Sequence, residues 1–493
     1  MANYVTKSVP VSYTKLNGGL NTNSGPLGLE ENESPDLQNV DFDKGGSFKQ
    51  RQGYTALNTT SISAGDQIDG LYWFITAAIK KPIAICNAKA YRQDNDGNGD
   101  PDGTWDDITG AVTITPAKHF DFETFIGYAL MTNDWDLPVK WSGAGNLELL
   151  DVPTGLTRAK FVTQFQNYAF LGNVVVSGTD RPSRFYFSNL RDIDTWTATD
   201  FYEVSMLDGE EITGMKVLGD RLVVYKTSSI YIVTFTGNND IPFTITKSKS
   251  SVGCIAPYSI QEINNNHVFL AYDGVYIFDG NNSYKLSEKI NPTINALKKT
   301  KLENAVSMYQ KDKNRYWLGV ASSSANDTVL TWDSFNNAWS KYAGINASSM
   351  AMFLINGVEQ RPYFGDYNGF VYRGDIGNDD YPANSITAID AYWWSNNKYF
   401  ADLTDSKGIP HVYIYHKDLV STLTFGYAYD FATAAAYTNT FSMNDTTDPG
   451  SVIKRQDLNG RGRAVKFYFG NSTVSETFQI DGIGVKALLE TNA

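Results

Sequence analysis

Cysteine is nearly absent from this sequence of 493 residues, which contains only Cys86 and Cys254. The two positions are far apart, and neither belongs to a CxxC pair or a Cys/His cluster. A disulfide framework or a structural zinc site would show more cysteines at closer spacing. The sequence therefore indicates neither, and we expect both thiols to be small buried side chains.

Long apolar runs are also absent. No stretch approaches the roughly 18 consecutive apolar residues that mark a membrane-spanning helix. Residues 1–20 lack the apolar core of a signal peptide. We expect no membrane span and no secretion signal.

Positive charge is in deficit. The sequence has 41 Lys and Arg residues against 54 Asp and Glu, a net charge of −13, and its pI is near 4.9. A protein that grips nucleic acid needs a surplus of Lys and Arg facing the phosphates. Tight DNA binding by the whole surface is therefore not expected, although an acidic wall would suit a passage through which DNA slides.

Recognisable catalytic motifs are missing as well. The four histidines are scattered, and there is no HExxH, no GxSxG and no Walker-type phosphate loop. A pair of carboxylates could serve a glycosidase mechanism, but the sequence singles out no pair. We predict that the chain is not an enzyme.

The sequence is rich in β-strand and turn signals. Aromatic residues make up 14% of the chain, and it contains 41 Gly, a composition typical of strands joined by tight turns. Short strand-like runs fill residues 68–374, and the most apolar run of each group recurs about every 48 residues, the length of a four-stranded propeller blade. We predict an all-β chain with a six- or seven-bladed β-propeller; a pair of β-sandwich domains is the alternative.

The same pattern divides the chain into three parts. Residues 1–60 have little apolar periodicity and are expected to form an extended N-terminal arm. Residues 61–375 are assigned to the propeller, with a short helix at residues 291–299. After a linker at residues 375–384, alternating segments in residues 386–493 predict a small C-terminal β-sandwich.

One acidic segment is a candidate metal site. Oxygen-bearing side chains occupy alternate positions of an EF-hand-like loop, at Asp94, Asp96, Asn98, Asp100 and Asp102. Trp105 stands where the bidentate Glu would be needed, so a Ca²⁺ site and a turn-rich hairpin tip both remain open. No other cofactor is expected.

Three consecutive aromatic residues, Tyr392, Trp393 and Trp394, could stack on sugar rings. Successive strand residues point to opposite faces, so at most two of them can face outward together. Packing in the core is the alternative use.

Several stretches, read in order, resemble the β-propeller tail and neck proteins of tailed bacteriophages, which include nozzle, hub and packaged-DNA stabilisation proteins. Near the N-terminus they are GGLNT at residues 18–22, ESPDLQNVD at 33–41 and GGSFKQRQGY at 45–54. Further along they are GCIAPYS at 253–259, NRYWLGV at 314–320, GRGR at 460–463 and FQIDGIG at 478–484.

This resemblance implies a structural component of the virion, assembled in the host bacterial cytoplasm. It implies a homo-oligomeric ring, expected to be a hexamer, that extends or closes the DNA channel and helps retain and eject the genome. Its partners would be the portal or adaptor, other tail proteins, and double-stranded DNA in transit. A carbohydrate-binding, receptor-binding or glycan-cleaving propeller is the alternative function.

Two assembly features are expected in such a ring. The arm would strap a neighbouring subunit, so deleting residues 1–58 should leave a folded propeller that fails to assemble. Arg461 and Arg463 lie in a Gly-rich turn and could pair with carboxylates of an adjacent ring; solvent-exposed turn arginines are the alternative.

Overall fold

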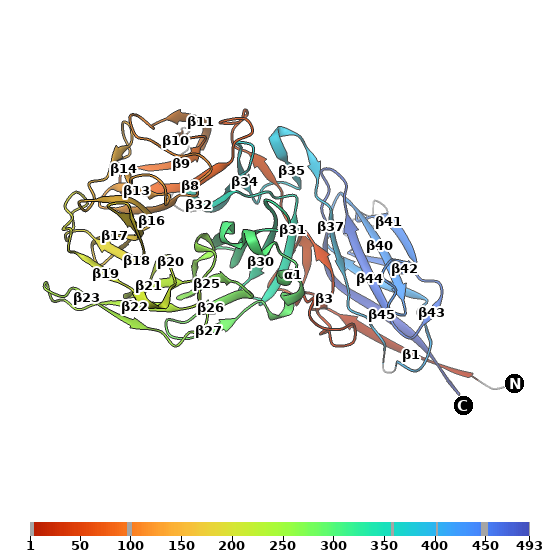
Figure 1. The fold of residues 1–493 in the computed structure, drawn as a ribbon. Coiled ribbons are helices and arrows are strands. Elements are labelled where there is room, and N and C mark those ends of the chain that lie inside the picture. The colour runs from red at the N-terminus through yellow and green to blue at the C-terminus, as the bar shows by residue number, and fades with distance from the viewer. Residues whose placement is uncertain (1–3, 96–100, 356–358, 401–402, 445–451, 493) are drawn as a thin grey trace.

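The fold is known from a computed structural model, which describes residues 4–95, 101–355, 359–400, 403–444 and 452–492. Strands dominate it (Figure 1), so the all-β prediction is confirmed. The helical elements are α1 (Asn291–Asn295) and the short 3-10 turns η1 (Met206–Asp208), η2 (Pro257–Ser259), η3 (Glu288–Ile290), η4 (Lys299–Asn304) and η5 (Pro382–Asn384). Among the described residues, no helix has the length and apolarity that crossing a bilayer requires.

Six four-stranded antiparallel sheets follow one another along the chain, each with its strands in sequence order. Sheet 1 is β8 (Ile68–Ile75), β9 (Lys80–Cys86), β10 (Lys89–Asn95) and β11 (Pro101–Asp107); sheet 2 is β12 (Asp121–Phe125), β13 (Tyr128–Thr132), β14 (Val139–Trp141) and β15 (Glu148–Leu149). Sheet 3 is β16 (Leu156–Phe165), β17 (Tyr168–Val176), β18 (Thr179–Phe187) and β19 (Phe201–Glu203); sheet 4 is β20 (Ile212–Leu218), β21 (Arg221–Lys226), β22 (Ile230–Phe235) and β23 (Phe243–Lys247). Sheet 5 is β24 (Gln261–Ile263), β25 (Asn266–Ala271), β26 (Gly274–Phe278) and β27 (Ser283–Lys285); sheet 6 is β28 (Val306–Gln310), β29 (Arg315–Ala321), β30 (Asn326–Asp333) and β31 (Ala338–Ala343).

The seventh sheet closes the circle. It contains β32 (Ser349–Ile355), β33 (Glu359–Gly365) and β34 (Val371–Gly374), and β34 pairs with β7 (Tyr54–Ala56) from the other end of the propeller. The first strands of neighbouring sheets lie side by side, and β32 contacts β8, so the sheets form a ring (Figure 1). The propeller prediction is confirmed.

Asparagine explains many of the tight turns. The β16–β17 turn has Gln166 and Asn167 at φ of 51° and 63°, and the β24–β25 turn has Asn264 and Asn265 at 51° and 60°. Consecutive left-handed residues define the two-residue hairpin turns whose twist suits antiparallel strands, and asparagine tolerates that conformation well.

A second unit is built from two further sheets. One has eight strands: β42 (Ile453–Asp457), β39 (His411–His416), β45 (Gln479–Asn492), β38 (Lys407–Gly408), β43 (Arg461–Gly462), β1 (Tyr4–Tyr13), β5 (Val40–Phe42) and β6 (Phe48–Gln50). The other has five: β4 (Leu37–Gln38), β37 (Ala391–Trp394), β44 (Val465–Asn471), β40 (Thr422–Tyr429) and β41 (Tyr437–Ser442). Both sheets contribute side chains to one hydrophobic core. We call this unit the C-terminal unit.

The N-terminal segment differs from the extended arm that the sequence predicts. Its strand β1 pairs with β45 over ten residue pairs, β4 joins the five-stranded sheet and β7 belongs to the propeller. The small parallel pair β2 (Gly19–Leu20) and β3 (Glu33–Ser34) lies against β31. The expected deletion of residues 1–58 would therefore remove strands from both units, and the propeller would lose its closing strand.

The predicted linker and helix are also shorter in the structure than expected. Within the linker, β35 (Asp379–Tyr381) pairs with β7, and β36 (Thr387–Ala388) continues the seventh sheet. The helix α1 covers only Asn291–Asn295. Both cysteines are buried and free, as expected.

Candidate functional site

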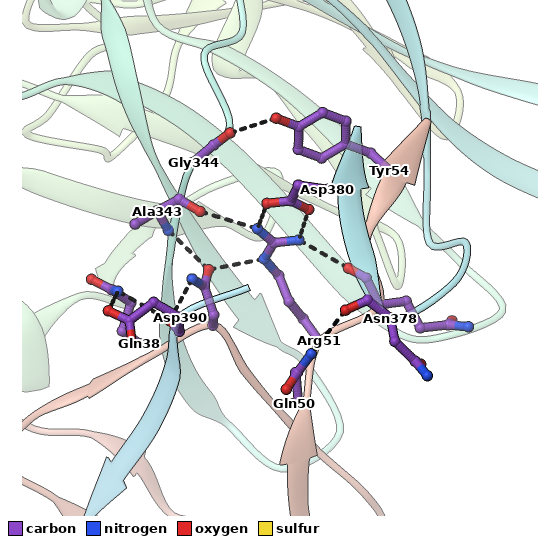
Figure 2. A network of polar contacts seen from close by, with 11 residues as sticks. Gln38, Gln50, Arg51, Tyr54, Ala343, Gly344, Asn378, Asp380 and Asp390 are labelled. Carbon is purple, nitrogen blue, oxygen red and sulfur yellow. Dashed lines mark hydrogen bonds and ion pairs between the residues drawn. The ribbon is translucent and has the colours of Figure 1, made fainter. Parts of the chain in front are cut away.

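A network of polar contacts joins the propeller to the C-terminal unit, and Arg51 lies at the centre of this joint (Figure 2). Its guanidinium forms a two-pronged ion pair with Asp380, with Nη1–Oδ1 and Nη2–Oδ2 distances of 2.8 and 2.6 Å. The remaining N–H groups donate to the Asn39 side chain and to the carbonyls of Gln52 and Ala343, at 2.8 to 3.1 Å. All five donors of the buried guanidinium are satisfied. Burial alone would lower the pKa of Arg51, but Asp380 raises it above the ordinary value.

Asn39 connects three parts of the chain through one side-chain amide. Its oxygen accepts from Arg51 Nε and from the backbone N–H of Ala343 at the end of β31. Its nitrogen donates to the carbonyl of Asp390, just before β37, at 2.8 Å. The residue has a φ of 55°, a conformation that asparagine adopts more readily than most residues. The amide therefore ties the N-terminal segment to both units.

Other side chains reinforce the joint in the same way. Gln50 Nε2 donates to the carbonyls of Asn378 and Glu476, at 3.0 and 3.1 Å. The Tyr54 hydroxyl donates to the carbonyl of Gly344 at 2.9 Å. These bonds join the seventh sheet, the end of sheet 6 and the C-terminal unit (Figure 2).

A second buried ion network lies beside the first. Arg315 on β29 pairs with Asp41 on β5 at 2.8 Å and with Asp375 at 3.5 Å, and Lys313 pairs with Asp375 at 3.0 Å. The Tyr342 hydroxyl also bonds to Asp41, and the Arg51 guanidinium lies 5.5 Å from the centre of the Tyr342 ring. Buried charges are tolerated only when they are paired in this way.

Aromatic side chains pack beside these polar contacts. Phe48 from β6 is fully buried and stacks on Trp393 of β37, with ring centroids 4.6 Å apart. It also meets Phe469 and Phe478 edge-on. Residues of sheets 5 and 6 belong to the same hydrophobic cluster. The aromatic segment is therefore used for packing at Trp393, while Tyr392 and Trp394 are partly buried.

The centre of the propeller contains a cavity of about 490 Å³, lined by the first strands of several sheets. Asp121 in its wall accepts the backbone N–H of Val162 at 3.0 Å, which links sheet 2 to sheet 3. His267 Nε2 lies 3.0 Å from the Val217 carbonyl, so this nitrogen carries the proton and Nδ1 accepts from the Tyr225 hydroxyl. Burial lowers the pKa of His119 and of His267 to about 4. The Asp121 carboxylate and the His267 ring are therefore both engaged in hydrogen bonds between or within the sheets.

Asp69 in the cavity wall makes folding pH-dependent. Burial raises the pKa of its carboxyl to about 6, although Gln67 and the Ala117 N–H donate to it. A raised acid pKa contributes stability below the unfolded pKa of 3.8, and that contribution is lost as the pH rises through about 6.

We expect the Asp69→Asn substitution to remove this pH dependence. Relative to the variant, the wild-type free energy of unfolding should fall by about 2.4 kcal/mol between pH 4 and pH 7.5. Urea unfolding at several pH values measures the difference. Parallel curves for the two proteins would contradict the assignment.

The predicted metal segment is only partly covered by the structure. Asp96, Asn98 and Asp100 lie outside the described residues. Asp94 pairs with Lys81 at 2.9 Å and with Arg92, and the Asp102 carboxylate accepts the N–H of Thr104 at 2.8 Å. Within the described ranges, no group of three or more His, Cys, Asp or Glu side chains is placed to hold a metal ion.

The predicted assembly arginines lie on the C-terminal unit. Arg461 on β43 and Arg463 just after it are both exposed. Arg461 donates to the carbonyl of Ser406 at 3.5 Å, and the N–H of Arg463 donates to Asp430 at 2.6 Å. They lie apart from the joint. The central residues of the joint were not predicted from the sequence. The stretch at residues 45–54 contains Arg51, but nothing in the sequence relates it to Asp380, 329 positions away.

The fold and the joint define the class: a closed β-propeller locked to a two-sheet unit by its own N-terminal segment. Residues 162–374, from β16 to the end of β34, match the family model described as Bacteriophage P22 Gp10, beta-propeller. This match confirms the resemblance predicted from the sequence, and it supports a phage β-propeller structural protein that is a component of the virion. No curated protein matches the chain.

Solved structures also resemble the chain at low identity. The computationally designed Ika8 protein is 12% identical, with a TM-score of 0.39 over 66% of this chain and 100% of its own. YCF48 bound to D1 peptide is 10% identical, with a TM-score of 0.39 over 69% and 97%. The WD40 β-propeller domain of Doa1 is 9% identical, with a TM-score of 0.37 over 66% and 96%.

Proposed function

We propose that the chain is a non-enzymatic subunit of a ring in the tail or neck of a phage. As part of the nozzle, hub or neck, the ring would extend or close the DNA channel and help retain and eject the genome. The family match over residues 162–374 carries this proposal. The subunits would form a homo-oligomeric ring, for which we propose six copies, next to the portal, the adaptor or other tail proteins.

The size of the central cavity bears on where DNA would pass. One turn of duplex DNA is about 34 Å long and its major groove alone is about 12 Å wide. A cavity of about 490 Å³ is too small for such an object. DNA would therefore pass through the opening enclosed by the ring of subunits, and the propeller would serve as a solid wall element.

The joint supports a mechanical role. A wall element under the pressure of packaged DNA must keep its two units in a fixed relation. Two buried arginines, their carboxylate partners and a shared aromatic core fix that relation here. Broken pairs would leave uncompensated buried charges, which makes relative movement of the units costly.

The virion role predicts where the protein is found. In a lysate of cells producing the phage, fractionated on a density gradient, the chain should co-migrate with DNA-filled particles, as detected by mass spectrometry. If it occurs only in the soluble fraction, the virion role is wrong, and glycan-binding and hydrolase assays become the next experiments.

A further inference from the structure

The outer face of the five-stranded sheet in the C-terminal unit presents aromatic rings that the joint does not use. On β37, Trp393 is buried in the core, so Tyr392 and Trp394 point to the opposite, outer side. In the strand register they lie across from Gly470 and Tyr468 of β44. The side chains of Tyr392, Trp394 and Tyr468 are all partly exposed. We call these three side chains the aromatic platform.

A glycine lets the ring of Tyr468 lie along the sheet. A Cβ atom at Gly470 would lie 2.4 Å from the Tyr468 hydroxyl oxygen and 2.8 Å from the ring carbon that carries it, so the ring occupies the space of the missing side chain. Gly426, the neighbour of Tyr468 on β40, adds no side chain either. The Tyr468 ring therefore lies over the backbone of β44 and is open to solvent on its outer side.

The other rings are fixed beside Tyr468. The rings of Tyr392 and Tyr468 have centroids 6.1 Å apart and planes inclined by 26°. The Tyr392 hydroxyl donates to the Asp36 carboxylate at 3.2 Å. The Trp394 ring lies 5.0 Å from that of Tyr468, and Lys466 Nζ lies 4.4 Å from its centre. Because these contacts hold the rings before any ligand binds, the entropic cost of binding is low.

The groups that surround the platform are small or polar. Across the sheet from Gly470 stand Thr424 and then Thr440, whose hydroxyl oxygens are 2.9 Å apart. On the side of Tyr392, the carboxylates of Asp36 and Asp390 are exposed. Aromatic faces bounded by hydroxyl and carboxylate groups are complementary to a ligand with C–H faces and hydroxyl edges, which is the chemistry of a pyranose sugar. An apolar protein surface would instead leave these polar groups without partners.

We propose that the aromatic platform binds a glycan of neutral pyranose sugars, whose rings stack on Tyr392 and Tyr468. Sugar hydroxyl groups donate to the carboxylates of Asp36 and Asp390. An acidic sugar would meet like charges at these two residues, which disfavours it. The inference goes beyond the ring proposed above and does not depend on it, since the platform is complete within one chain.

Glycan binding by the purified full-length chain tests the proposal. The probe is an array of oligosaccharides of glucose, galactose, mannose and N-acetylated amino sugars, and the oligosaccharide that binds best is then titrated calorimetrically. Tyr392→Ala and Tyr468→Leu should each weaken binding about tenfold. Tyr468→Phe keeps the aromatic face and should bind like the wild type, whereas a leucine keeps only the apolar bulk.

The matched control is Tyr415→Ala on β39. Tyr415 is a tyrosine of the other sheet of the same unit, is 37% exposed, and lies similarly over a glycine, with its Cε2 atom 3.3 Å from a Cβ placed at Gly484. Its loss should leave glycan binding unchanged. Thermal unfolding of all variants shows whether a loss of binding accompanies a loss of structure.

Three results would overturn the proposal. The first is a wild-type chain that binds no oligosaccharide of the array at millimolar concentration. The second is a folded Tyr468→Leu variant that binds as well as Tyr468→Phe. The third is a Tyr415→Ala variant that loses as much affinity as Tyr392→Ala. A chain that binds no glycan but co-migrates with DNA-filled particles retains the virion role, so the two proposals fail separately.

Discussion

Replacing Arg51 with alanine is expected to lower the free energy of unfolding by about 3 to 5 kcal/mol. The substitution leaves Asp380, whose side chain is 7% exposed, as an uncompensated buried charge. It also removes donors from Asn39 and from the carbonyls of Gln52 and Ala343. Chemical unfolding monitored by tryptophan fluorescence measures the change.

Two further variants show whether the loss of stability in Arg51→Ala comes from the broken ion pair. Arg455→Ala breaks an exposed pair with Asp457 and should cost no more than about 1 kcal/mol. The double substitution Arg51→Met with Asp380→Leu removes both charges and should destabilise less than Arg51→Ala alone. If the double variant is the least stable of the three, the cost does not come from an unpaired charge.

Replacing Phe48 with alanine is expected to cost a similar amount, about 3 to 5 kcal/mol. Phe48 is fully buried, and its ring is surrounded by those of Trp393, Phe469 and Phe478. Because the ring comes from the N-terminal segment and its neighbours come from the C-terminal unit, the cavity would weaken that unit most. Differential scanning calorimetry should show an earlier transition for the C-terminal unit.

The matched control for Phe48 is Phe335→Ala. Phe335 is 58% exposed, and its loss should change the free energy of unfolding by no more than about 0.5 kcal/mol. If both substitutions shift the calorimetric transitions equally, then Phe48 does not stabilise the joint in the way described here.

The propeller could be predicted because its strands are local. Each sheet from β8 to β31 pairs neighbours in sequence, so the alternation of strand runs and turn residues repeats with the sheet. The contribution of residues 4–56 could not be read in the same way. Their strands are two to ten residues long, and β1, β4, β6 and β7 pair with partners hundreds of positions away, such as β1 with β45. Short polar stretches of this kind look like an arm when their partners are unknown.

The site was less accessible to prediction than the fold. The buried pairs Arg51–Asp380 and Arg315–Asp41 join residues that are distant in sequence and carry no motif. In the sequence, Arg51 is one of 41 basic residues, and only burial distinguishes it from the others. Residues that are adjacent in the sequence, such as the acidic run from Asp94 to Asp102, are easily recognised as a candidate site, whereas pairs that only the fold brings together are not.

The pairing of β1 with β45 can form only at the end of chain synthesis. At roughly 5 to 20 residues per second, the ribosome finishes the partner strand about 25 to 100 s after it has made β1. The propeller ring likewise stays open until β34 meets β7. A product that terminates before β34 therefore lacks both closures, and one that terminates between β34 and β45 lacks the pairing of β1. Only chains carried through to β45 can complete the C-terminal unit.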